Sequence, residues 1–196
     1  DALVFLLTIA KISKDDIVIV IDEPELHLHP SLQDKLAKLL MTESENSQVF
    51  ISTHSPFFFK NVYMHELTNV FINKTVDSQV VISNAKDEGF GLLKWSPSWG
   101  EICFFAYDLA TVEFHDDLYS SIQDKYDKPT VGAVESWFIQ QGQDKEIVWT
   151  NEMGNNVEET LMTSIRNRIH HGDNIYRPSY NYEQLKDSIM RMIKLL

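Results

Sequence analysis

Two carboxylates directly follow a strongly apolar stretch near the start of the 196-residue sequence. Residues 17–21 are all β-branched, and Asp22 and Glu23 come immediately after them. Ligands of open α/β sheets bind at the carboxyl ends of the strands. There, one carboxylate can hold a magnesium ion and a second can polarise an attacking water molecule. The pattern predicts phosphate chemistry, although an ordinary acidic turn after a strand fits the bare Asp-Glu pair equally well.

A second polar group follows a second short apolar run. Residues 49–51 are apolar, and residues 52–56 read Ser-Thr-His-Ser-Pro. The end of a neighbouring strand can reach the same phosphate group, to which His54 can donate a hydrogen bond. A lone histidine is more often structural. The order of strand, Asp22-Glu23, helix, strand and Ser-Thr-His nevertheless favours one shared site.

The two motifs resemble the Walker B and switch-histidine segments of ABC-like P-loop ATPases. The resemblance rests on residues 22–30, which read Asp-Glu-Pro-Glu-Leu-His-Leu-His-Pro, and on residues 52–56. Similar strings recur in the bacterial group that includes the overcoming-lysogenization-defect nucleases and many anti-phage defence ATPases. The resemblance implies an α/β fold, the C-terminal lobe of an ABC-type head, with a mostly parallel sheet and flanking helices.

The same resemblance implies roles for individual residues. Asp22 would bind magnesium, Glu23 would be the general base, and His54 would be the switch that contacts the γ-phosphate. All three would lie against ATP and Mg²⁺, the cofactors of this family. Residues 25–29 would take the place of the D-loop, which meets a partner head. A homodimer joined through the ATPase heads is therefore expected.

One part of the family's pattern does not occur in the sequence. There is no Gly-x-x-x-x-Gly-Lys-Ser/Thr string and no Ser-Gly-Gly-like signature. The first string forms the backbone cradle for the phosphates. The 196 residues on their own are therefore expected to bind ATP poorly, whereas a parent protein with an N-terminal lobe is expected to bind it.

Hydrophobic periodicity predicts the elements that position these residues. The first domain, residues 1–92, is expected to contain a buried helix, a strand buried on both faces, an amphipathic helix, a short strand and a strand pair. These span residues 2–12, 17–21, 30–41, 49–51, 69–73 and 79–83. The second domain, residues 93–196, is predicted to be mainly helical. Its expected helices span residues 101–126, 131–140, 157–171 and 182–196, and one edge strand spans residues 146–149.

A basic cluster ends one helix of the predicted second domain. Arg166 and His171 are five residues apart, and Asn167 follows the arginine. This spacing resembles the Arg-x4–6-His motif of HEPN ribonucleases. It implies metal-independent RNA cleavage, with histidine moving protons and arginine stabilising phosphate charge, at a site that usually forms between two protomers. In a structural alternative, both residues complement the helix dipole or hold the loop at residues 172–178.

Residues 113–117, which read Glu-Phe-His-Asp-Asp, are a weaker candidate for a metal site. Consecutive residues of a helix point in different directions, so they cannot converge on one ion. The run is therefore interpreted as a solvated acidic helix face.

Charge and composition limit the remaining classes of function. The net charge of −12 argues against a broad nucleic-acid-binding surface and against an ATPase that moves DNA. All four arginines nevertheless follow residue 165, so a local anion site there stays open. Cys103 is the single cysteine, and no apolar run is long enough to cross a membrane. A cytoplasmic protein without membrane contact is expected.

Two functions remain in view. In the first, the ATPase head of an anti-phage protein gates a C-terminal domain that cleaves RNA, and Arg166 and His171 line one cleft. In the second, the C-terminal helices of an ATPase subunit dock a separate nuclease or toxin. The second predicts an exposed apolar patch on those helices and local structural bonds for Arg166 and His171.

Overall fold

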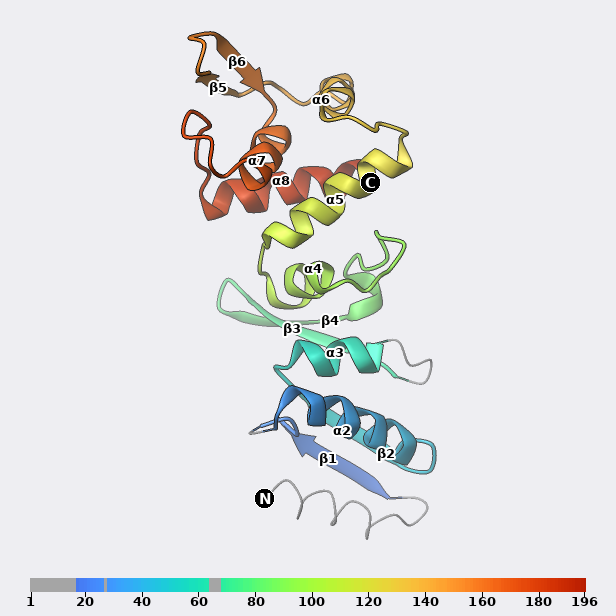
Figure 1. Cartoon of the computed structure of the whole chain (residues 1–196). Coiled ribbons are helices and arrows are strands. Elements are labelled where there is room, and N and C mark those ends of the chain that lie inside the picture. The colour runs from blue at the N-terminus through green and yellow to red at the C-terminus, as the bar shows by residue number, and fades with distance from the viewer. Residues whose placement is uncertain (1–16, 27, 64–67) are drawn as a thin grey trace. The chain divides into compact units, whose positions relative to one another are not determined.

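The computed structural model describes residues 17–26, 28–63 and 68–196. The chain divides into two compact units, residues 1–88 (unit 1) and residues 89–196 (unit 2), each considered by itself (Figure 1). The division at 88/89 comes shortly before the one expected at 92/93. The helix expected at residues 2–12 lies outside the described residues.

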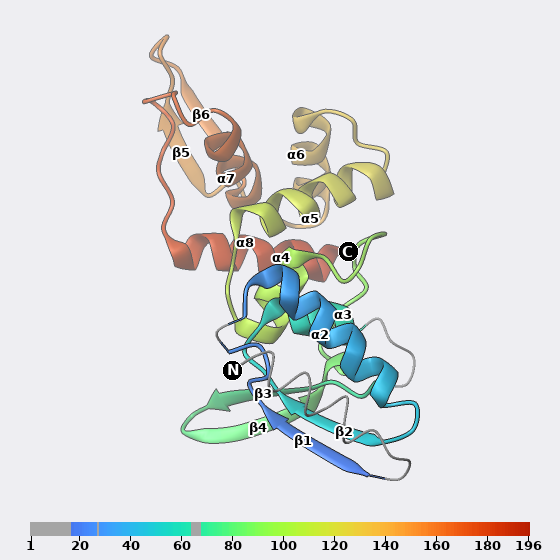
Figure 2. The ribbon, with the colours of Figure 1, turned by 60° about the horizontal axis from the view of Figure 1, so that its bottom comes forward.

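Unit 1 contains a parallel pair of strands, β1 (Val18–Asp22) and β2 (Gln48–Ser52). Helices α2 (Pro30–Glu43) and α3 (Pro56–Tyr63) lie on the same side of this pair (Figure 2). Buried side chains of the helices pack against partly buried side chains of the strands and fix the strand ends. The cluster consists of Leu36, Ala37, Leu40 and Phe58 from the helices, with Ile21, Val49 and Ile51 from the strands.

Among the described residues, side chains cover only one face of β1, so the expectation of a strand buried on both faces was wrong. Side chains of a strand point alternately to its two faces, and α2 and α3 pack on one of them. Val18, Val20 and Phe50 on the other face are 62%, 76% and 58% exposed. The apolar run marked the strand but overstated its burial.

The other two strands of unit 1 form an antiparallel hairpin, β3 (Phe71–Val76) and β4 (Gln79–Asn84). Its turn residues Asp77 and Ser78 have φ values of 47° and 64°, and positive φ at both positions is what a type I′ turn requires. A short 3-10 helix, η1 (Ala85–Asp87), follows. Within the described residues every sheet is two-stranded and only β1–β2 is parallel, where a mostly parallel sheet was expected.

Unit 2 packs its helices around one apolar core, and α5 contacts both α7 and α8. No helix in the described part of the chain is long and apolar enough to span a membrane. The elements are α4 (Trp99–Glu101), a π-helical turn η2 (Ile102–Ala106), α5 (Val112–Lys125), α6 (Val131–Gln140), β5 (Ile147–Thr150), β6 (Asn156–Glu159), α7 (Leu161–His170) and α8 (Tyr182–Leu195).

The helix expected at residues 101–126 is interrupted in the structure. Residues 108–111 are not helical, and Asp108 adopts a φ of 54°. The Thr111 hydroxyl then accepts a hydrogen bond from the Phe114 amide at 3.2 Å and starts α5. A side-chain cap of this kind begins a new helix.

The helix expected at residues 157–171 begins later than predicted, and a strand precedes it. Residues 156–159 pair with β5 in an antiparallel hairpin. Thr160 then caps α7 by accepting a hydrogen bond from the Thr163 amide. The predicted stop before Gly172 agrees with the end of α7 at His170.

Candidate functional site

The parallel register of β1 and β2 brings two polar residues to the same edge of the sheet. Asp22 lies opposite Ser52, whose hydroxyl donates a hydrogen bond to Asp22 Oδ1. The Glu23 amide donates to the Ser52 carbonyl at 2.9 Å. The ends of both strands are therefore joined by side-chain and backbone bonds.

Glu23 begins a tight turn beyond β1. Its φ of 45° is uncommon for a residue with a side chain, and such conformations cluster at functional sites. The Leu26 amide closes the turn on the Glu23 carbonyl at 3.0 Å. Glu23 Oε1 lies 3.6 Å from Nε2 of His54, whose side chain is 88% exposed. The structure thus brings Asp22, Glu23 and His54 to one sheet edge, with the imidazole accessible to a ligand.

A pocket of about 360 Å³ adjoins this edge. It is a shallow, open and mostly apolar hollow, and its polar lining includes two carboxylates and the exposed histidine. A phosphate group could contact His54 from this side, with Glu23 nearby. The lining residues are Glu23, Glu25, Leu26, Gln33, His54, Ser55, Pro56 and Phe57.

The site offers magnesium one oriented carboxylate rather than a complete set of protein ligands. Asp22 is exposed, and Ser52 holds its Oδ1. Across residues 17–26, 28–63 and 68–196, no three His, Cys, Asp or Glu side chains form a metal-binding group. Mg²⁺ usually takes one or two carboxylates and completes its shell with phosphate oxygens and water. The donor set fits a phosphate-bound magnesium ion and does not fit a structural metal site.

Two side chains that the motifs did not single out tie down the loop after β2. Glu25 Oε1 accepts hydrogen bonds from the Thr53 hydroxyl and from the His54 amide, the latter at 3.1 Å. Gln33 Oε1 accepts a hydrogen bond from the Ser55 hydroxyl at 2.8 Å. Glu25 stands within the Asp-Glu-Pro-Glu string, but its partners follow a different strand. Only the folded arrangement reveals these contacts.

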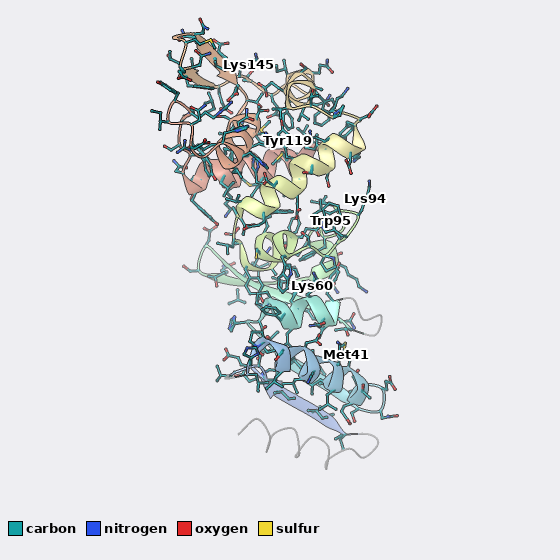
Figure 3. The ribbon with its side chains drawn as sticks, in the orientation of Figure 1. Met41, Lys60, Lys94, Trp95, Tyr119 and Lys145 are labelled. Carbon is teal, nitrogen blue, oxygen red and sulfur yellow. The ribbon has the colours of Figure 1, made fainter. Side chains whose placement is uncertain are left out.

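The structure does not place Arg166 and His171 in one cleft of a single chain. The Arg166 guanidinium lies over the ring of Tyr119, with Cζ 5.9 Å from the ring centre, and donates to Asn167 Oδ1 at 3.3 Å. Tyr119 points into the region between α5 and α7 (Figure 3). His171 is exposed at the end of α7. Five helical residues correspond to about 140° around the axis, so the two side chains leave different sides.

Asn167 belongs to a buried polar network. Its Nδ2 donates to Glu159 Oε1 at 3.0 Å, and Trp149 Nε1 donates to Glu159 Oε2 at 3.3 Å. Arg177 pairs with Glu159 at 3.3 Å and stacks on Trp149, with Cζ 4.8 Å from the ring centre. The Arg177 and Glu159 side chains are only 15% and 11% exposed. The network joins the β5–β6 hairpin, α7 and the loop before α8.

The acidic run at residues 113–117 is not a uniformly solvated face, so that interpretation was wrong for its middle. Phe114 and His115 are fully buried. His115 Nε2 lies 2.9 Å from the hydroxyl of Ser188 on α8. Burial, and secondarily the nearby His170, lowers the pKa of His115 to about 3. His115 is therefore a neutral, bonded core residue.

The family model of the AAA ATPase domain matches residues 2–59 of the chain. The matched segment includes Asp22, Glu23 and His54 and does not reach unit 2. Residues 2–59 are therefore similar to part of an AAA ATPase domain.

Two curated proteins are similar to part of the chain. The OLD nuclease of Thermus scotoductus is 36% identical over 72 residues, which are 36% of this chain and 13% of that protein. The Septu protein PtuA of Bacillus thuringiensis is 30% identical over 79 residues, 40% of this chain and 19% of that protein. The chain thus matches less than a fifth of the length of either relative. No solved structure matches the chain significantly.

Proposed function

We propose that unit 1 supplies the magnesium-binding and water-activating half of an ATP-hydrolysing head in an anti-phage defence protein. The observation that carries the proposal is the meeting of Asp22, Glu23 and His54 at the ends of two parallel strands. Its occurrence in a segment similar to the AAA ATPase domain supports ATP as the substrate. Similarity to an OLD nuclease and to a Septu protein supports the role in defence.

In the proposed reaction each residue has a separate task. Glu23 orients a water molecule and accepts its proton as the water attacks the γ-phosphate in line. His54 donates a hydrogen bond to the γ-phosphate and loses this contact after hydrolysis. Asp22, oriented by Ser52, would hold magnesium, which neutralises charge on the β- and γ-phosphates.

The phosphate-binding loop is not among these 196 residues. In the proposal, another segment or polypeptide supplies that loop. A second head closes over the nucleotide, and the two heads form a homodimer.

ATP turnover by the complete natural protein tests the proposal. Glu23→Gln keeps the size of the side chain but removes the base, so turnover should fall at least ~100-fold. Glu45→Gln changes an exposed glutamate in the turn after α2 and is the matched control. It should turn over ATP at the wild-type rate. Equal rates for both variants and wild type would exclude Glu23 as the base.

RNA cleavage by unit 2, gated by the ATPase head, is a second candidate function. Arg166 has no carboxylate within 4.0 Å among the described residues, and His171 is exposed. Both side chains can therefore reach a phosphate of RNA. Because one chain does not bring them together, the proposed site combines residues of two protomers.

RNA cleavage by the activated complete protein tests this second function. Arg166→Ala and His171→Ala should each abolish cleavage while the protein stays folded. Lys145→Ala, which changes an exposed cation before β5, should leave cleavage intact. Normal cleavage in both test variants would remove Arg166 and His171 from the chemistry.

Docking of a separate nuclease or toxin is the alternative for unit 2. Exposed apolar side chains on the β5–β6 hairpin and on the loop before α8 favour it. Val148, Met153 and Ile175 are 59%, 87% and 84% exposed. Absence of any RNA cleavage, together with a stable complex with a nuclease or toxin that Met153→Asp and Ile175→Asp disrupt, would select this alternative.

A further inference from the structure

We propose that Glu25 is a positioning residue that sets the switch imidazole of His54 against Glu23. The proposal rests on the proposed function of unit 1, because it concerns the same site. Glu25 lies in the turn that leaves β1, two residues after Glu23. Its side chain reaches the loop that leaves β2, so one carboxylate connects the two segments of the site.

The contacts of Glu25 fix the backbone on both sides of the switch residue. Glu25 Oε1 accepts hydrogen bonds from the Thr53 hydroxyl and from the His54 amide at 3.1 Å. The Thr53 hydroxyl in turn accepts a hydrogen bond from the Ser55 amide at 2.9 Å. Hydrogen bonds to an ionised carboxylate are stronger than those between neutral groups. The backbone of residues 53–55 is therefore held by one carboxylate.

The imidazole of His54 depends on this backbone for its position. Its side chain is 88% exposed, so packing restrains it little. Its distance of 3.6 Å from Glu23 Oε1 is longer than a good hydrogen bond. A displacement of the His54 backbone therefore changes the distance between the imidazole and Glu23.

Glu25 itself is poorly placed to act as a second base. Its Oε1 already accepts two hydrogen bonds, and its Oε2 is buried with no hydrogen-bond partner among the described residues. An acceptor for the proton of water needs an accessible oxygen. Glu23 fills that role in the proposed reaction, and Glu25 acts through His54.

Hydrogen bonds that do not involve Glu25 hold the loop at Ser55. The Ser55 hydroxyl donates to Gln33 Oε1 at 2.8 Å, and Gln33 Nε2 donates to the Leu28 carbonyl at 3.1 Å. Phe58 at the start of α3 is fully buried in the core of unit 1. Removal of the Glu25 carboxylate should therefore shift the His54 backbone while unit 1 stays folded.

Steady-state ATP hydrolysis by the complete natural protein tests this inference. Glu25→Ala should lower kcat roughly 10- to 100-fold, because a displacement of about 1 Å in an active site can cost that much. The KM for ATP should change much less. Glu25→Gln keeps an acceptor oxygen for both donors and should restore most of kcat. Glu45→Ala is the matched control and should behave as wild type.

A double variant shows whether Glu25 acts through the imidazole. Glu25→Ala combined with His54→Ala should be no slower than His54→Ala alone, because both changes remove the same contact. Thr53→Val removes one donor to Glu25 at constant shape and should give a smaller loss of kcat. It serves as the test if Glu25→Ala does not fold. A wild-type kcat in Glu25→Ala would overturn the inference. If Thr53→Val is the test, a wild-type kcat in that variant would do the same. A double variant whose loss of kcat is the product of the two single losses would also overturn it.

The Glu23→Gln variant separates this inference from the proposed function. If Glu23→Gln is inactive and Glu25→Ala is fully active, only the role of Glu25 is wrong. If Glu23→Gln hydrolyses ATP at the wild-type rate, the proposed function fails and the role of Glu25 fails with it.

Discussion

Residues typical of catalysis occur at the strand ends of unit 1 and at the basic end of α7 in unit 2. The fold brings the first group together but not the second. Asp22, Glu23 and His54 follow two strands, and the parallel register brings them to one edge. Arg166 and His171 belong to one helix and its end, and they leave it on different sides. Residues at the ends of parallel strands meet within one chain. A pair at the end of one helix needs a second element or a second molecule to complete a site.

The largest expected effect concerns the oriented carboxylate of unit 1. Asp22→Asn should reduce magnesium-dependent ATP turnover of the complete protein about 100-fold or more, because loss of one well-placed electrostatic group has this size of effect. Asp34→Asn on α2 is the control, since among the described residues Asp34 pairs only with exposed Lys38 on the same helix. Equal turnover in the two variants would show that Asp22 does not contribute to ATP hydrolysis, and the strand ends of unit 1 would then not be a catalytic site.

The buried network of unit 2 should carry a large share of its stability. Glu159→Gln leaves Arg177 largely buried without its counter-charge, which should cost about 3–5 kcal/mol of unfolding free energy. Tryptophan fluorescence can follow this unfolding, because all four tryptophans lie in unit 2. Glu146→Gln breaks the more exposed pair with Arg191 and should cost no more than about 1 kcal/mol. Equal losses would contradict a structural role for the network.

Acid should destabilise unit 2 through His115. In the fold, burial lowers the pKa of His115 to about 3 from an ordinary value of 6.5. The unfolded chain therefore binds the proton first. The contribution of His115 to the free energy of unfolding is fully present above pH 6.5. It is lost as the pH falls toward 3, by up to about 1.4 kcal/mol per pH unit. In His115→Gln the decline between pH 6.5 and 5 should be shallower by this amount, and identical slopes would refute the assignment.

The smallest expected effect concerns Arg166. Its contact with Tyr119 is a cation–π interaction at 5.9 Å, so Arg166→Ala should lower the unfolding free energy of unit 2 by only about 0.5–1 kcal/mol. If Arg166→Ala abolishes RNA cleavage but lowers the unfolding free energy by only this amount, Arg166 has a functional role. A loss above about 3 kcal/mol would mark it as structural, and the resemblance to a nuclease motif would then reflect packing.

The sequence predicted the positions of most elements better than their surroundings. β-Branched composition located β1, and turn residues located the β3–β4 hairpin, because both signals are local. The exposed face of β1 and the neutral, buried His115 depend on which elements pack nearby, and local periodicity does not contain that information. Strand β6 was missed because the four residues at 156–159 gain their conformation from pairing with β5.

The same distinction applies to the candidate site. Asp22, Glu23 and His54 could be named because they lie within three residues of the ends of two apolar runs, where the two strands end. The hydrogen bonds of Glu25 could not be predicted, because its carboxylate bonds to residues 28 and 29 positions away. Such contacts arise from the register of two strands and the turn at Glu23, and they appear only in the folded chain.

The nucleotide that copurifies with the complete protein tests the central claim most directly. Glu23→Gln is expected to retain ATP and to form a dimer, because water is no longer activated while binding persists. Wild type should copurify with ADP rather than ATP under the same conditions. Recovery of ATP from a dimeric Glu23→Gln protein is the predicted result. Recovery of ADP from Glu23→Gln, in the same proportion as from wild type, would contradict a catalytic site at the ends of β1 and β2.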